Sequence, residues 1–166
     1  MKRLTLVRHA KSDWGDPGLS DHDRPLNPRG MRAAPAVGKA LAAKGAKPDL
    51  LLSSTALRAA TTAGLIADEL GVDREEIRYT ESLYLASVGE YERVVAAVDE
   101  TSRIEHLMTF GHTPGTHDFA HHLTGRDEID RFVTCAVATI ELDIEHWGEV
   151  GASCGRLVDF FTPHDL

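Results

Sequence analysis

An arginine and a histidine follow the first apolar segment of the chain, and both residue types can act on an anion. The apolar run ends at Val7, and Arg8 and His9 come directly after it, before the chain turns polar. An arginine fork donates two parallel hydrogen bonds to paired oxygens, and a neutral imidazole nitrogen can act as a nucleophile. Open α/β sheets bind ligands at the carboxyl ends of their strands, which is where this dipeptide is predicted to lie. Taken alone, the pair is more simply interpreted as an ordinary solvated strand end.

Two later segments place similar side chains at the same predicted edge. Residues 49–54 form a second apolar run, and Arg58 lies in the first turn of the helix predicted after it. Residues 104–110 form another apolar run, and His112 follows it at the start of a further helix. The amino termini of two helices would add unpaired N–H groups and partial positive charge. We therefore predict a phosphate pocket surrounded by two arginines and two histidines.

Apolar segments alternate with helical patterns over most of the chain, which predicts an α/β fold. The predicted strands are 3–8, 49–54, 77–80 and 104–110, followed by β-rich segments at 132–144 and 155–161. Four helices are predicted, of which the first runs from the cap Asn27-Pro28 to Gly45 and the second covers 56–70. The third ends at about residue 99, and the fourth begins at a second cap, Thr113-Pro114. This pattern indicates a three-layer α/β/α sandwich with a mainly parallel sheet, in a single domain spanning residues 1–166. The long polar connection 11–27 is a candidate binding loop.

The composition is typical of a soluble globular protein with an acidic surface. Hydrophobic residues make up 42% and charged residues 27% of the 166 residues, and the formal net charge is -8. This charge argues against nucleic acid or an anionic membrane as a partner, because both attract clustered Lys and Arg. No apolar run is long enough to cross a bilayer, and the amino terminus does not resemble a signal peptide. Cys135 and Cys154 lack CxxC spacing, so we expect reduced thiols and a cytoplasmic location.

The segments LVRHAKS, SSTALRAATTA and FGHTPG, in this order, resemble the motifs of the histidine phosphatase superfamily. The segments SDHDRPLNPRG, LYLAS and GRLVDFFTPHDL are similar to its SixA-like phosphohistidine phosphatase branch, and the resemblance spans Leu4 to Leu166. It implies a phosphoglycerate mutase-like fold and a phosphatase that needs neither a metal nor a cofactor. It also implies that His9 attacks phosphorus and forms a covalent phosphohistidine intermediate, which water then hydrolyses.

The resemblance implies roles for further residues and a class of substrate. Arg8, Arg58 and His112, the last as a donor and cation, would stabilise the charge on the phosphoryl oxygens. The candidate substrate contacts are Arg24, Ser12 and Thr113, of which Thr113 would also cap the following helix. The implied substrate is a phosphohistidine-containing protein. A phosphatase of small phosphorylated metabolites and a non-catalytic phosphate-binding module are the alternatives, and the oligomeric state stays open.

The proton donor for the leaving group is not assigned by the sequence. Many superfamily members carry a carboxylic acid after the third strand, whereas this chain has Leu85 at or near that position. Glu81 is the nearest carboxylate and a possible acid. The acids of the long loop are further candidates, namely Asp13, Asp16, Asp21 and Asp23. Without a fixed acid, hydrolysis of a phosphomonoester would lose a contribution of order 10²–10⁴-fold, whereas a protonated imidazole leaves readily.

The spacing of His117 and His121 puts two imidazoles on one helical face. This HxxxH pattern lacks the Glu of the metalloprotease motif. We therefore predict no metal site there.

Overall fold

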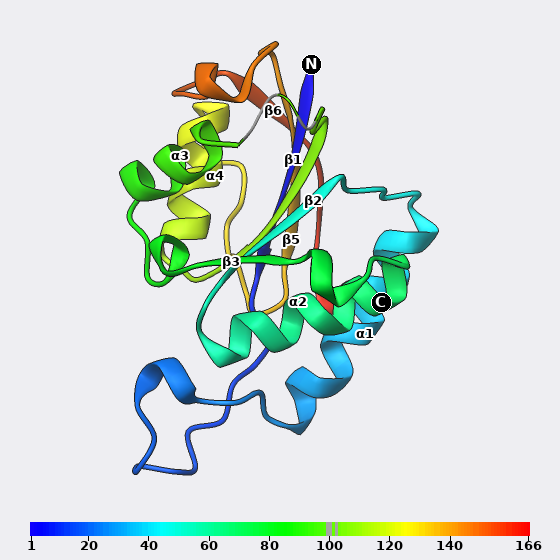
Figure 1. Ribbon diagram of the computed structural model, residues 1–166, viewed down its shortest axis with the longest axis vertical. Helices are drawn as coiled ribbons and strands as arrows, with labels where there is room; N and C mark the ends of the chain where they lie inside the picture. Colours follow the sequence, from blue (N-terminus) through cyan, green and yellow to red (C-terminus); the bar gives the residue numbers. More distant parts are fainter. Residues whose placement is uncertain (99–100, 102) are drawn as a thin grey trace.

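A six-stranded sheet forms the centre of the molecule, with the strand order β3-β2-β4-β1-β5-β6 (Figure 1). The computed structural model describes residues 1–98, 101 and 103–166. The strands are β1 Lys2–Arg8, β2 Leu50–Ser54, β3 Arg78–Thr80, β4 His106–Gly111, β5 Val137–Leu142 and β6 Gly155–Phe161. Strands β3, β2, β4 and β1 run parallel, whereas β5 pairs antiparallel with β1 and with β6. The sheet is therefore mainly parallel, as the sequence predicts.

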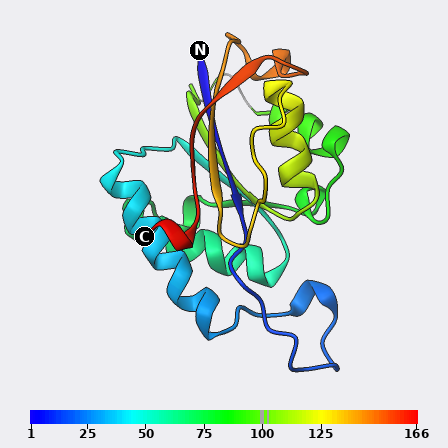
Figure 2. The ribbon, with the colours of Figure 1, turned by 180° about the vertical axis from the view of Figure 1, so that it is seen from behind.

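In the described part of the chain, α-helices cover both faces of this sheet (Figures 1 and 2). They are α1 Pro28–Ala43, α2 Leu57–Leu70, α3 Val88–Ala96 and α4 Gly115–Thr124. Helices α1 and α2 pack together on one face, and α3 and α4 pack together on the other, which confirms the three-layer α/β/α sandwich. Helix α3 was expected to reach about residue 99, a position outside the described residues. Across residues 1–98, 101 and 103–166, none of the helices has both the length and the apolar character needed to span a membrane.

One of the two predicted helix caps forms, and the other does not. The Asn27 side chain accepts a hydrogen bond from the backbone N–H of Gly30, and Pro28 occupies the first helical position of α1. The prediction that Thr113 caps the last helix is wrong. The peptide bond between Thr113 and Pro114 is cis, helix α4 begins one residue later, and no side chain caps it. Pro114 rather than Thr113 therefore occupies the cap position.

The β-rich segment predicted at 132–144 contains a shorter strand, because its first residues support the end of β1 instead. The backbone N–H of Cys135 donates to the carbonyl oxygen of His9 at 3.0 Å. The carbonyl oxygen of Phe132 accepts a hydrogen bond from Arg8 at 3.0 Å. Phe132 and Cys135 are both buried. Their apolar character thus reflects packing under the end of β1 rather than pairing within the sheet.

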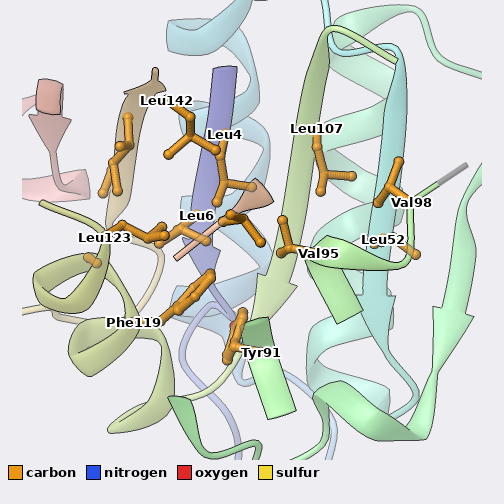
Figure 3. Close-up of a cluster of buried hydrophobic side chains, with 14 of the residues drawn as sticks. Leu4, Leu6, Leu52, Tyr91, Val95, Val98, Leu107, Phe119, Leu123 and Leu142 are labelled. Carbon is orange, nitrogen blue, oxygen red and sulfur yellow. The ribbon is translucent and has the colours of Figure 1, made fainter. Parts of the chain in front are cut away.

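Two buried apolar clusters hold the helices against the sheet. On the face of α3 and α4, Leu4 and Leu6 of β1 pack with Tyr91 and Phe119 (Figure 3). All four are fully buried, and burial of a large apolar side chain stabilises a fold by roughly 1.5–3 kcal/mol. On the opposite face, Val7 of the same strand belongs to the cluster beneath α1 and α2. Strand β1 is therefore buried on both faces, which fixes the position of its carboxyl end.

Candidate active site

The carboxyl ends of β1, β2 and β4 meet at one edge of the sheet, where a pocket of about 390 Å³ opens. Its lining includes all the residues that the sequence singled out for catalysis or substrate contact, namely Arg8, His9, Ser12, Arg24, Arg58, His112 and Thr113. The possible acid Glu81 is not in this lining. The other lining residues are Lys11, Trp14, Asp21, Leu85 and Thr134. A larger cavity of about 550 Å³ lies between β2, β3 and α3, but it contains none of the predicted site residues.

His9 is buried, with only 6% of its surface exposed, and its ring has a defined tautomer. Its backbone N–H donates to the carbonyl oxygen of Gly111, at the end of β4, at 3.0 Å. The ring Nδ1 lies 2.7 Å from the carbonyl oxygen of Ala10. Because a carbonyl oxygen can only accept, Nδ1 carries the proton and Nε2 of the neutral ring keeps its lone pair. His9 therefore has the tautomer in which Nε2 can act as a nucleophile.

The surroundings of His9 favour its neutral form. Burial lowers the pKa of His9 to about 4, against a partly opposing hydrogen bond to Ala10. The positive charges of Arg58, Arg8 and Arg24 lower the same pKa further. The pocket therefore keeps the imidazole of His9 uncharged at neutral pH, the form that a nucleophile would need.

Arg58 lies in the first turn of α2, as the sequence predicts, and only 3% of its surface is exposed. Its Nη1 donates to the backbone carbonyl oxygen of Asp21 at 2.6 Å. Its Nη2 lies 3.0 Å from Oδ2 of Asp21 and 3.4 Å from Nδ1 of His112. Within the described residues, its Nε is buried without a hydrogen-bond partner. The guanidinium group thus joins the loop, the helix and the second histidine.

His112 lies just after β4 and is held as a neutral ring. Its Nδ1 accepts the hydrogen bond from Arg58, because a guanidinium group can only donate. The single N–H of the neutral ring is then on Nε2, which donates to Oγ of Ser54 at 2.9 Å. Burial lowers the pKa of His112 to about 3, and the neighbouring His9 and Arg58 act in the same direction. His112 is therefore neutral in this arrangement, and its expected positive charge stays a prediction for the pocket with a phosphoryl group bound.

The long polar segment 11–27 contributes residues to the pocket, as expected of a binding loop. Arg24 donates through Nη1 to Oγ of Ser12 at 2.7 Å. Its Nε and Nη2 donate to Oδ1 of Asp21 at 3.1 and 3.0 Å. The Arg24 guanidinium also stacks on the indole of Trp14, with 3.4 Å between its central carbon and the ring centroid. Arg24 is thus held by contacts within its own loop and is 7% exposed.

Of the residues that the structure describes, one carboxylate lines the pocket, and it is not a proton donor. Leu85 lines the pocket with a left-handed backbone φ of 51° and is 57% exposed, so an apolar side chain stands where an acid was expected. Asp21 lines the pocket, whereas the other three candidate acids of the loop do not. The hydrogen bond from Tyr84, followed by that from Arg58, holds the pKa of Asp21 far below its usual range, although partial burial opposes them. Asp21 is therefore ionised at neutral pH.

Several contacts of the site are not evident from the sequence. Ser54, at the end of β2, accepts a hydrogen bond from the second histidine of the pocket. Thr62 accepts from the backbone N–H of Ala10 at 3.0 Å and donates to the carbonyl oxygen of Arg58 at 2.7 Å. Thr62 lies four residues after Arg58, and this helical spacing is the one signal that places it on the same face. No comparable signal in the sequence indicates that Tyr84 contacts the site.

The histidines of α4 lie outside this pocket. The rings of His117 and His121 are 4.5 Å apart between centroids, and Nε2 of His117 donates to the carbonyl oxygen of Ile129 at 2.7 Å. In the part of the chain that the structure describes, no group of three or more His, Cys, Asp or Glu side chains could hold a metal ion. The pair therefore has a structural partner rather than a ligand set around it.

Comparison with known proteins identifies the family of this chain. The sequence model of the histidine phosphatase superfamily (branch 1) matches residues 4–141. The chain belongs to the histidine phosphatase superfamily. Members of this superfamily are phosphatases and mutases, and the fold of this member is phosphoglycerate mutase-like.

Relatives of this histidine phosphatase superfamily member span nearly its whole length. An uncharacterized protein of Mycobacterium tuberculosis is 35% identical over 166 residues, covering 95% of this chain and 99% of the relative. An Agrobacterium tumefaciens protein assigned as the phosphohistidine phosphatase SixA has a solved structure with a TM-score of 0.81. It is 30% identical, with 98% of each chain covered. A structure of the protein histidine phosphatase SixA with tungstate shares the fold, with a TM-score of 0.83, 20% identity and 98% of each chain covered.

Proposed function

We propose that this protein is a metal-independent phosphatase that removes the phosphoryl group from phosphohistidine on a protein, through a covalent intermediate on His9. One observation carries the proposal. A single pocket joins the neutral, buried imidazole of His9, whose Nε2 keeps its lone pair, to the guanidinium groups of Arg8, Arg24 and Arg58. These cations supply the positive charge that phosphoryl transfer requires, so the proposed reaction needs no metal ion.

The reaction proceeds in two displacements. In the first, Nε2 of His9 attacks phosphorus in line, and a new P–N bond forms as the bond to the leaving nitrogen breaks. The arginines stabilise the charge on the phosphoryl oxygens. The same negative charge raises the pKa of His112, which favours its protonated, donating form beside the oxygens. In the second displacement a water molecule attacks phosphorus, phosphate is released and the neutral imidazole of His9 is regenerated.

Among the described residues, the pocket lining has no proton-donating carboxylic acid, and this supports phosphohistidine as the substrate. An alkoxide leaving group needs a proton from the enzyme, and general acid catalysis contributes about 10²–10⁴-fold. An imidazole is a much better leaving group once it is protonated. The pocket lining has the apolar Leu85 where the family acid was expected, and its carboxylate Asp21 is ionised. Phosphomonoesters of alcohols are therefore expected to be poor substrates.

The mouth of the pocket supports a protein rather than a small molecule as the bearer of the phosphoryl group. Trp14 and Leu85 line the pocket, and 76% and 57% of their surfaces are exposed. Large exposed apolar side chains at a site suit contact with another protein surface. In the alternative, the loop 11–27 would act as a lid over a small phosphorylated metabolite. Phosphate release from a phosphohistidine-bearing protein, compared with a panel of phosphomonoesters, distinguishes these two substrate classes.

The covalent step has a direct test. Brief incubation with substrate should leave acid-labile, base-stable phosphate on His9 of the native protein, and His9→Ala should abolish turnover. His164→Ala, an exposed histidine outside the pocket, is the matched control and should keep full activity. Turnover retained in His9→Ala would contradict the assignment of the nucleophile. Absence of turnover on every substrate in the native protein would instead favour a non-catalytic phosphate-binding module.

A further inference from the structure

The carboxylate of Asp21 binds both of the arginines that lie at the loop side of the pocket. Its Oδ1 accepts from Nε and Nη2 of Arg24 at 3.1 and 3.0 Å. Its Oδ2 accepts from Nη2 of Arg58 at 3.0 Å and from the hydroxyl of Tyr84 at 2.5 Å. The backbone carbonyl oxygen of Asp21 accepts from Nη1 of Arg58 as well, at 2.6 Å. One loop residue thus connects three segments that are distant in the sequence.

These hydrogen bonds occupy the whole carboxylate. An ionised carboxylate offers about four lone-pair sites, and four donors already point at the two oxygens of Asp21. The group has no acceptor site left for a proton or N–H of a substrate. Asp21 therefore acts on the neighbouring side chains and not on the reacting atoms.

The two arginines differ in how firmly their own elements hold them. Arg58 belongs to α2 and is 3% exposed, so its backbone position is set by the helix. Arg24 belongs to the connection between β1 and α1, and two like charges placed side by side repel each other. A shared negative charge between them removes this repulsion. The two carboxylate oxygens of Asp21 also orient the guanidinium planes, because each oxygen accepts a directional hydrogen bond.

We infer that Asp21 is a positioning residue, which clamps Arg24 and Arg58 into one preorganised pair for the phosphoryl group, with Tyr84 holding the clamp from the outside. The inference rests on the proposed function and adds to it a residue without direct contact to the substrate. Groups that are oriented in advance do not have to reorganise during the reaction. A displacement of a positioning group by 1 Å is enough to cost on the order of 10²-fold in rate.

Asp21→Asn is the main test, because the amide keeps the shape but replaces one accepting oxygen by a donor. We expect kcat/KM on a phosphohistidine-bearing protein to fall by about 10–100-fold, and the affinity for tungstate, measured by calorimetry, to fall by about 10-fold. Asp23→Asn is the matched control. It makes the same charge change in the same loop, at a side chain that is 66% exposed and outside the pocket, and it should leave both quantities unchanged.

A second variant distinguishes the loss of the Asp21 contacts from a general loss of structure. Tyr84→Phe removes the hydroxyl that binds Asp21, and the affinity for tungstate should fall by about 5-fold, as expected for one hydrogen bond. In the Asp21→Asn background the same change should have no further effect, because Tyr84 acts through Asp21. Independent, multiplying effects would overturn the inference. If Asp21→Asn does not fold, the tungstate affinity of Tyr84→Phe is the deciding measurement. An affinity equal to that of the native protein would then overturn the inference.

The tungstate measurement keeps this inference separate from the proposed function. A native protein that hydrolyses no substrate would refute the phosphatase proposal, while the anion affinities would still report on the clamp. Tungstate bound by Asp21→Asn as tightly as by the native protein would overturn the clamp even if turnover is found. Tighter binding would overturn it too, since the carboxylate would then compete with the anion for the arginines.

Discussion

Nδ1 of His9 donates to the carbonyl oxygen of Ala10, the next residue in the chain, at 2.7 Å. The partner that orients the ring is therefore a neutral backbone oxygen and not a carboxylate. A carboxylate would raise the pKa of the imidazole, whereas here burial and the adjacent arginines dominate and lower it to about 4. This arrangement fixes the tautomer without promoting protonation of the ring.

We expect His9 to titrate near pH 4, well below the ordinary histidine value of about 6.5. Because the pKa is lowered, the neutral form of this proposed nucleophile persists as the pH falls and is lost only near the folded-state pKa. ¹⁵N NMR of the imidazole rings measures this titration, with His9→Asn identifying the signal. A His9 resonance that titrates near pH 6.5 would contradict the electrostatic description of the pocket.

Leu85→Glu should improve the hydrolysis of alkyl phosphomonoesters. The change places a carboxylic acid in the pocket lining, where its proton can reach a leaving alkoxide, and general acid catalysis is worth about 10²–10⁴-fold when the geometry is right. We expect a gain of at least about 10-fold in kcat on alkyl phosphates. Leu85→Gln has the same size but no acidic proton, and serves as the control. Equal rates for the two variants would show that position 85 does not reach the leaving group.

Tyr91→Phe should lower stability without disturbing the apolar packing of the ring. The hydroxyl of Tyr91 donates to Oγ1 of Thr116 at 2.7 Å, and Thr116 donates to the carbonyl oxygen of His112 at 2.8 Å. Loss of a buried hydrogen bond costs about 1–2 kcal/mol in the free energy of unfolding. Urea denaturation measures the change, and Tyr79→Phe, at a 48% exposed position, should stay within about 0.5 kcal/mol of the native protein. Equal stabilities would exclude a role for the Tyr91 hydroxyl.

Acid should destabilise the fold through its buried neutral histidines, and His106 allows a test away from the pocket. Burial, followed by the charge of Arg3, lowers the pKa of His106 to about 4 against the opposing charge of Asp49, and its Nε2 lies 2.8 Å from Oγ1 of Thr5. The unfolded chain binds a proton below about pH 6.5 and the folded chain only near pH 4, so stability falls as the pH drops between these values.

The slope of this loss approaches about 1.4 kcal/mol per pH unit for each such histidine. Urea denaturation at pH 7 and pH 5 measures it. His106→Gln should reduce the difference between the two pH values, whereas His164→Gln, at the exposed carboxyl terminus, should not. An unchanged difference in His106→Gln would show that this ring does not control acid stability.

Much of the architecture was predictable because it depends on local patterns. Continuous apolar runs predicted β1, β2 and β4, and the cap of Asn27 predicted the start of α1, since each depends on neighbouring residues alone. The predictions failed where contacts with a segment distant in the sequence determine the local structure. The apolar residues around Phe132 pack beneath the end of β1 instead of forming a strand.

The sequence by itself determined that Arg8, His9, Arg58 and His112 meet in one pocket, because the ends of parallel strands must share one edge of the sheet. It could not determine their charge states. The neutral form of His112 and the ionised form of Asp21 depend on burial and on distances to side chains from other elements. Only the tertiary structure decided that the acid at position 21 binds two arginines instead of donating a proton. Hydrogen bonding and desolvation act over a few ångströms in space, and separation along the chain does not encode them.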